Sequence, residues 1–182
     1  IHSMQDACRP LMVCDLLDKG ADFARALGMP GDLLIDTGHP SGLRMRDRGG
    51  FGDPSSAKNA LLIECGQHWE IRAATVARQA TARFLQQLRV VDEADLADWI
   101  TLPFEAQQII HVTDAVVADS MAFRFVADYR GLEVIKRAGT LIATDGVREI
   151  RTPYDDCVLV MPSVRQARAG VTVVRFARRR LL

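Results

Sequence analysis

The pattern of apolar residues changes near residue 103, and this change most restricts the folds open to the chain. Before it, strand-like runs alternate with helical patterns, in the order 9–16, 18–28, 32–38, 60–64 and 67–89. After it, short strand-like segments are separated by glycine, proline and aspartate, at 108–118, 121–127, 132–143, 156–162 and 171–177. We therefore predict an α/β domain with a buried sheet over residues 1–103 and a β-rich domain over residues 104–182.

The composition is that of an ordinary globular protein and excludes several classes of partner. Of the 182 residues, 48% are hydrophobic, and the 23 basic and 23 acidic residues cancel. Without a net field, neither nucleic acid nor an anionic membrane is expected as a partner. The locally basic segment RFARRR, residues 175–180, is interpreted as a solvated tail. No apolar stretch approaches the ~20 residues that span a bilayer, so we expect a cytoplasmic protein.

The cysteines do not predict a disulfide framework or a structural zinc site. Cys8, Cys14, Cys65 and Cys157 lack CxxC spacing and lie in apolar or mixed surroundings. We expect reduced, mostly buried thiols.

Glu64 follows the apolar run ALLI and is the first candidate catalytic residue. A buried carboxylate is costly unless it is hydrated, paired, near a metal or protonated. Ligands of α/β sheets gather at the carboxyl ends of strands, where this residue is expected to lie, with Gly66 turning the chain and His68 beginning the next helix. The alternative is a glutamate that caps the helix or forms a structural ion pair.

The polar loop at residues 38–56 is the second candidate region. It carries His39 and several arginines in a setting too polar to be core, and loops of this length in compact domains are often functional. Arginine can bind a carboxylate through two hydrogen bonds. Arg46 is therefore a candidate for substrate binding, and a solvated charge cluster is the alternative.

The histidines of this chain do not supply a complete zinc site. A catalytic zinc takes about three protein ligands, of which a His-x-x-Glu pair supplies two. The residues three positions after His2, His39, His68 and His111 are Gln5, Gly42, Ile71 and Asp114. Only His111 and Asp114 come near the pattern, and in a strand they point to opposite faces.

Two segments resemble the succinylglutamate desuccinylase/aspartoacylase family. IHSMQDACRPLM, residues 1–12, resembles the segment with that family's third zinc ligand, and ALLIECGQHWE, residues 60–70, resembles its strand with the catalytic glutamate. RAGTLIATDG and TPYDDCVLVMP resemble parts of its β-rich C-terminal domain. The resemblance implies the C-terminal part of a zinc-carboxypeptidase-like α/β domain followed by a small all-β domain.

The resemblance also implies residue roles and a reaction. His2 corresponds to the zinc-ligating histidine and Glu64 to the general acid/base. Zn2+ would activate a water and polarise the carbonyl of a small N-acyl amino acid, whose amide bond is hydrolysed, while Arg46 would hold a substrate carboxylate.

The family's His-x-x-Glu pair and its upstream Asn-Arg substrate motif have no counterpart in this sequence. On the resemblance we therefore expect a fragment of a longer protein, inactive by itself. A partial domain with an exposed sheet edge is also expected to form a homo-oligomer or to aggregate.

Three other functions fit parts of the sequence. Cys65 with His68 as base could form a thiol nucleophile, although a thiol beside a carboxylate in a buried strand should have a raised pKa. Lys136 could carry a cofactor in a lipoyl- or biotinyl-like domain, although its flanking residues do not fit. A noncatalytic binding module derived from the hydrolase family is the third alternative.

Overall fold

The structure is a computed structural model and describes residues 1–14, 16–36, 44–163 and 167–181. Two compact units make up the chain. Unit 1 contains Ile1–Gln5, Pro10–Ile109 and the C-terminal end, and unit 2 contains Asp6–Arg9 and Ile110–Arg180. In the described part of the chain, no helix has the length and apolar character needed to cross a membrane.

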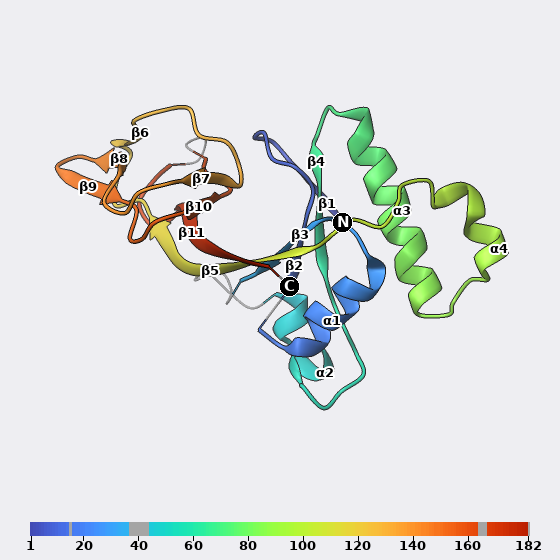
Figure 1. The fold of residues 1–182 in the computed structure, drawn as a ribbon. Helices are drawn as coiled ribbons and strands as arrows, with labels where there is room; N and C mark the ends of the chain where they lie inside the picture. The colour runs from blue at the N-terminus through green and yellow to red at the C-terminus, as the bar shows by residue number, and fades with distance from the viewer. Residues whose placement is uncertain (15, 37–43, 164–166, 182) are drawn as a thin grey trace. The chain divides into compact units, whose positions relative to one another are not determined.

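Unit 1 is a mixed α/β layer (Figure 1). Its strands are ordered β1 (His2–Met4), β4 (Leu62–Gln67), β2 (Leu11–Cys14) and β3 (Asp32–Ile35). β1 is parallel to β4 and β2 is parallel to β3, whereas β2 and β4 are antiparallel. The helical elements are α1 (Asp18–Leu27), η1 (Met45–Asp47), α2 (Gly49–Gly52), α3 (Ile71–Gln87), α4 (Glu93–Leu96) and η2 (Ala97–Trp99).

Local sequence explains the elements around β2, α1 and β3. Both strands are buried at every position, as expected for continuous apolar runs. Helix α1 places Ala21, Ala24 and Leu27 in the core and ends at Gly28, which has φ 63° and donates its N–H to Arg25 O. The prediction of a short helix closed by Gly28 is confirmed.

The end of β4 and the start of α3 differ from the sequence prediction. β4 continues past Glu64 to Gln67, and α3 begins at Ile71 rather than near residue 67. The strand continues because β1 pairs with it as far as Gln67, and Gly66 takes a φ of 114° within it. Placing Glu64 at the strand end was therefore wrong.

The described residues of unit 2 form strands and no helix. The strand order is β5 (Gln108–Val117), β11 (Thr172–Leu181), β10 (Cys157–Val160) and β7 (Glu133–Ile135). A second sheet has the order β6 (Phe123–Phe125), β8 (Leu141–Asp145) and β9 (Arg148–Arg151). Strand β5 begins with two residues that belong to unit 1.

Two expectations for this half of the chain were wrong. The run at 132–143 forms two strands, β7 and β8, and β9, which pairs with β8 across the Asp145-Gly146 turn, was not predicted. Residues 175–180 are part of β11 and not a tail. β11 pairs with β10 through residues 175–177 and neighbours β5 on its other side, so the basic segment belongs to a sheet.

Candidate active site

Glu64 lies inside unit 1 between two strands, and His2 is its neighbour on one of them. The backbone register pairs Glu64 with His2 on β1 and with Leu11 on β2. His2 Nδ1 lies 3.6 Å from Glu64 Oε1. The parallel pairing of β1 and β4 thus brings together two side chains that are 62 positions apart in sequence. Both were singled out from the sequence.

Burial dominates the electrostatics of Glu64. The residue is 8% exposed, and its Oε2 has no hydrogen-bond partner among the described residues. Burial raises the pKa of the Glu64 carboxyl, and the nearby His2 opposes that rise. A raised pKa makes the carboxylate a stronger base, which favours proton transfer in general acid/base catalysis.

One member of this pair, His2, lines a cavity of about 410 Å³ in unit 1. Its walls are formed by Ile1, His2, Arg44, Met45, Arg46 and Ala60–Leu62. His2 and Arg46, predicted separately as metal ligand and substrate-binding residue, therefore line the same cavity. Arg44 is the second arginine of its lining.

Arg46 is buried, which corrects the expectation that the polar loop stands apart from the core. It is 4% exposed, its Nη2 donates to Asp36 O at 2.8 Å, and its Nε lies 3.7 Å from Asp47 Oδ1. Arg44 Nη2 lies 2.9 Å from Asp36 Oδ2. These contacts fix both guanidinium groups where a solvated loop would leave them mobile.

Asp36 was not singled out from the sequence. It is 4% exposed and directly follows β3. The reasoning applied to Glu64, that a carboxylate after a buried apolar strand is a candidate for a functional position, would have found it.

Lys19 binds the segment that follows the two arginines, a role that no sequence pattern predicts. Its Nζ donates to the backbone oxygens of Gly50, Asp53, Ser56 and Lys58 at 3.2, 2.6, 3.3 and 2.9 Å. Asn59 Nδ2 donates in return to Lys19 O at 2.7 Å. One cation on α1 therefore stabilises residues 50–58, which lead from α2 toward β4. His39, the other candidate of this loop, lies outside the described residues.

His68 and Cys65 do not form a nucleophilic pair. Cys65 is buried, and burial raises the pKa of its thiol to about 11, so the thiolate is scarce at neutral pH. His68 precedes α3 instead of beginning it, and its Nδ1 lies 2.7 Å from Ser3 Oγ on β1. The four cysteines, all within the described residues, form no disulfide.

The side chains present fit only part of a zinc site. The described residues contain no group of three or more histidine, cysteine, aspartate or glutamate side chains arranged to hold a metal ion. One imidazole, His2, next to a buried carboxylate with an unsatisfied oxygen is the donor set available. It matches one ligand and the general base of a catalytic zinc centre.

No protein-family model matches the sequence, and no curated protein matches it. Solved structures do match. Succinylglutamate desuccinylase from Vibrio parahaemolyticus superposes with a TM-score of 0.64 at 15% identity, over 98% of this chain and 52% of that chain. The Vibrio cholerae enzyme gives 0.64 at 14% identity, over 97% and 51%.

The match extends beyond one genus. A succinylglutamate desuccinylase/aspartoacylase from Rhodobacter sphaeroides has a TM-score of 0.59 at 13% identity, over 100% of this chain and 56% of that chain. The chain thus spans about half the length of these solved relatives. The resemblance read from the sequence is confirmed at the level of the fold: this chain resembles about half of a succinylglutamate desuccinylase/aspartoacylase structure.

Proposed function

We propose that the protein to which this chain belongs is a zinc-dependent hydrolase of the amide bond in an N-acyl amino acid or a related small molecule. The observation that carries the proposal is the pairing of His2 with the buried Glu64 beside a cavity that two arginines line. The fold similarity supports a deacylase over other hydrolases that use a glutamate base.

In this proposal, Glu64 moves the proton. Its carboxylate accepts the proton of the attacking water and delivers it to the nitrogen of the leaving amine, for which a raised pKa is suited. When bound, zinc would supply Lewis acidity, lowering the pKa of water toward about 7 and polarising the amide carbonyl. Of the described residues, His2 would contribute to holding it.

The arginines bind and orient the substrate. Arg44 and Arg46 line the same cavity as His2, and a guanidinium group matches the geometry of an amino-acid carboxylate. Asp36 positions both through its carboxylate and its backbone oxygen.

The test uses the full product of the gene that encodes these residues, assayed against a panel of N-succinyl and N-acetyl amino acids. Glu64→Gln should lower kcat by about 100-fold or more while zinc content stays unchanged. His2→Gln should lower zinc content. Arg46→Lys, which keeps the charge but loses the planar fork, should raise KM more than it lowers kcat.

Glu93→Gln, at an exposed position of α4, is the matched control and should leave all three readouts unchanged. A metal-free product that hydrolyses none of these substrates would refute the proposal that the protein is a zinc-dependent hydrolase. The noncatalytic binding module would then be the remaining function, with Glu64 and His2 as a structural pair.

A further inference from the structure

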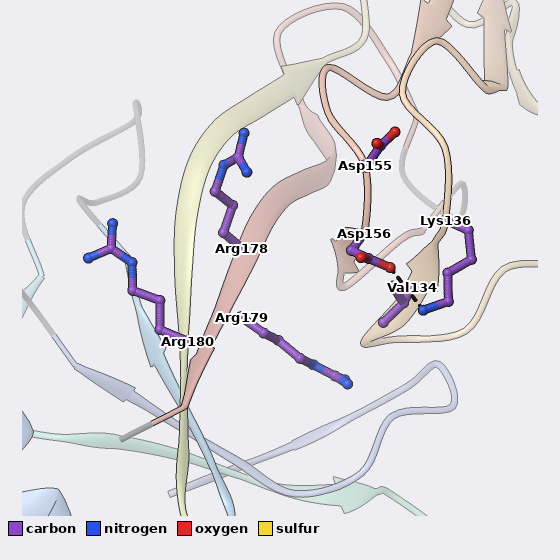
Figure 2. Close-up of a pocket in the computed structure, with 7 residues that line it drawn as sticks. All are labelled: Val134, Lys136, Asp155, Asp156, Arg178, Arg179 and Arg180. Atoms are coloured by element: carbon purple, nitrogen blue, oxygen red, sulfur yellow. Dashed lines mark hydrogen bonds and ion pairs between the residues drawn. The ribbon is translucent and has the colours of Figure 1, made fainter.

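A second cavity, of about 560 Å³, lies within unit 2 and has no part in the proposed hydrolysis (Figure 2). It lies where the antiparallel ladder of β7, β10 and β11 ends. Cys157 pairs with Ile135, so the residues just before β10 and just after β7 continue past the last strand pairs. On β11, Arg178, Arg179 and Arg180 follow Ala177, which is paired with Val158.

The charges at this cavity are unbalanced. Four cationic side chains, Lys136 and Arg178–Arg180, line it with two carboxylates, Asp155 and Asp156. Lys136 Nζ and Asp156 Oδ1 are 2.8 Å apart and neutralise each other. Asp155 Oδ1 accepts the backbone N–H of Ala138 at 2.7 Å.

The three arginines form no ion pair with a carboxylate of the described chain. Arg178 stacks over the ring of Tyr154, 3.6 Å from its centroid, and Arg179 Nη2 donates to Leu132 O at 3.2 Å. These contacts hold the side chains but leave their charge uncompensated. Like charges on adjacent residues repel, so a bound anion would relieve that repulsion.

The side chains do not all face the same way. Figure 2 shows Arg179 extending from β11 toward the side of Val134, while Arg178 and Arg180 leave the other face of the strand. This alternation is the normal period of a β-strand. Arg179 is therefore the cation that an anion in the space beside β7 meets first, and its two neighbours add to the positive potential.

We propose that this cavity binds a phosphate group of a small molecule, with Arg179 as its main anchor. Guanidinium groups bind phosphate through paired hydrogen bonds, and the volume is that of a small-molecule site, about 300–1,000 Å³. The arginines are exposed, so a single carboxylate would gain little there. A phosphate carries about −1.5 to −2 charges and can engage the field of several arginines.

The test is a calorimetric titration of the protein with pyrophosphate as the probe, at about 20 mM and about 150 mM ionic strength. Arg179→Gln should weaken binding by about tenfold and Arg178→Gln by about two- to fourfold. Arg151→Gln is the control, because this exposed arginine on β9 is ion-paired to Glu149 and does not line the cavity. It should change binding less than about twofold.

Asp156→Asn tests whether removing a negative charge from the cavity strengthens the binding of pyrophosphate. Asp156 has φ 53°, a conformation that asparagine tolerates, so the variant should fold. It removes a negative charge and releases Lys136, so pyrophosphate should bind several times more tightly. Weaker or unchanged binding in this variant would overturn the proposal.

Two further probes decide the class of ligand. Succinate, a dicarboxylate, should bind at least about tenfold more weakly than pyrophosphate. Equal binding would overturn the phosphate assignment. A single-stranded oligonucleotide whose affinity rises with its length, together with no saturation by pyrophosphate, would overturn the small-molecule site.

Discussion

At the scale of single residues, burying the ionised carboxylate of Glu64 costs free energy that its neighbours do not fully offset. A carboxyl buried between two strands with one unsatisfied oxygen disfavours its own ionisation. His2, at 3.6 Å, offsets this only in part. Residues held in such positions commonly lower stability where they serve activity.

Glu64→Gln should therefore make unit 1 more stable at neutral pH while removing the proposed activity. The folded-state pKa is raised, so the folded protein keeps its proton to a higher pH than the unfolded chain does. Wild-type stability should fall as pH rises from the ordinary value of 4.5 through the folded pKa. Glu64→Gln does not lose stability in this way. The difference in Tm between the variant and the wild type should therefore grow as pH rises from 4.5 to the folded-state pKa, and then stay constant.

Thermal unfolding followed by circular dichroism between pH 4 and 8 measures this effect. Glu93→Gln should follow the wild-type curve, since that side chain is exposed on α4. A variant that loses stability at pH 7 would mean that the ionised Glu64 is a stabilising ion-pair partner.

At the scale of elements, the segment between β3 and β4 depends on α1. Lys19 places one ammonium group within hydrogen-bond distance of four backbone oxygens, three of which belong to residues outside any helix or strand. The two arginines of the first cavity precede this anchored segment directly. Helix α1 therefore supports the site without contributing a residue to it.

Lys19→Met keeps the length of the side chain and removes its charge and donors. Hydrogen bonds to a charged group are worth about 1.5–3 kcal/mol each, and Lys19 is partly exposed, so we expect a loss of about 2–3 kcal/mol in the free energy of unfolding. Faster amide exchange in residues 50–58 should accompany it. Arg25→Met, on the same helix, removes an exposed i,i+3 pair to Asp22 and should cost less than about 0.5 kcal/mol.

The C-terminal end of α1 gives a second prediction. Gly28 has φ 63°, and a Cβ placed there would overlap the ring of Phe104. Gly28→Ala should lower the free energy of unfolding by about 3 kcal/mol, since the left-handed backbone costs about 1–2 kcal/mol and overpacking adds about 1–3. Denaturant titration measures it.

Gly49→Ala separates the two causes of that loss. Gly49 also has a positive φ, 49°, but a Cβ there meets nothing within 4 Å. Gly49→Ala should lower the free energy of unfolding only by the cost of the left-handed backbone, about 1 kcal/mol. Equal losses at both positions would mean that Phe104 moves aside without cost.

At the scale of the whole molecule, the chain has the fold of about half of its solved relatives. The side chains of its described residues supply one imidazole beside the proposed base and no three-ligand group. Residues 1–182 alone should therefore retain less than about 0.2 zinc per chain after dialysis, because a catalytic zinc takes about three protein ligands. Stoichiometric zinc, measured by atomic emission, would show that the assigned ligand set is wrong.

The domain assignment from the sequence, with its boundary at residue 103, stays a proposal. Limited proteolysis around residues 97–109 and separate expression of residues 104–182 would test it. The two compact units of the structure give the ranges to compare.

The sequence alone determined those elements whose signals are local. Continuous apolar runs gave β2, β3 and β10, and the helical period closed by Gly28 gave α1, because burial and backbone conformation there depend on neighbours in the chain. The resemblance also selected His2 and Glu64, which the structure places side by side.

The tertiary structure decided what depends on distant partners. Strand β1 is three residues long, too short to show a period, and exists through its pairing with β4, which also carries β4 past Glu64. Arg46 is buried because Asp36 and Asp47 receive its guanidinium group, and residues 175–180 are held in a strand because β11 lies between β5 and β10 in the sheet. Hydrogen bonds between segments far apart in sequence leave no periodic trace in either segment, so only the folded chain reveals them.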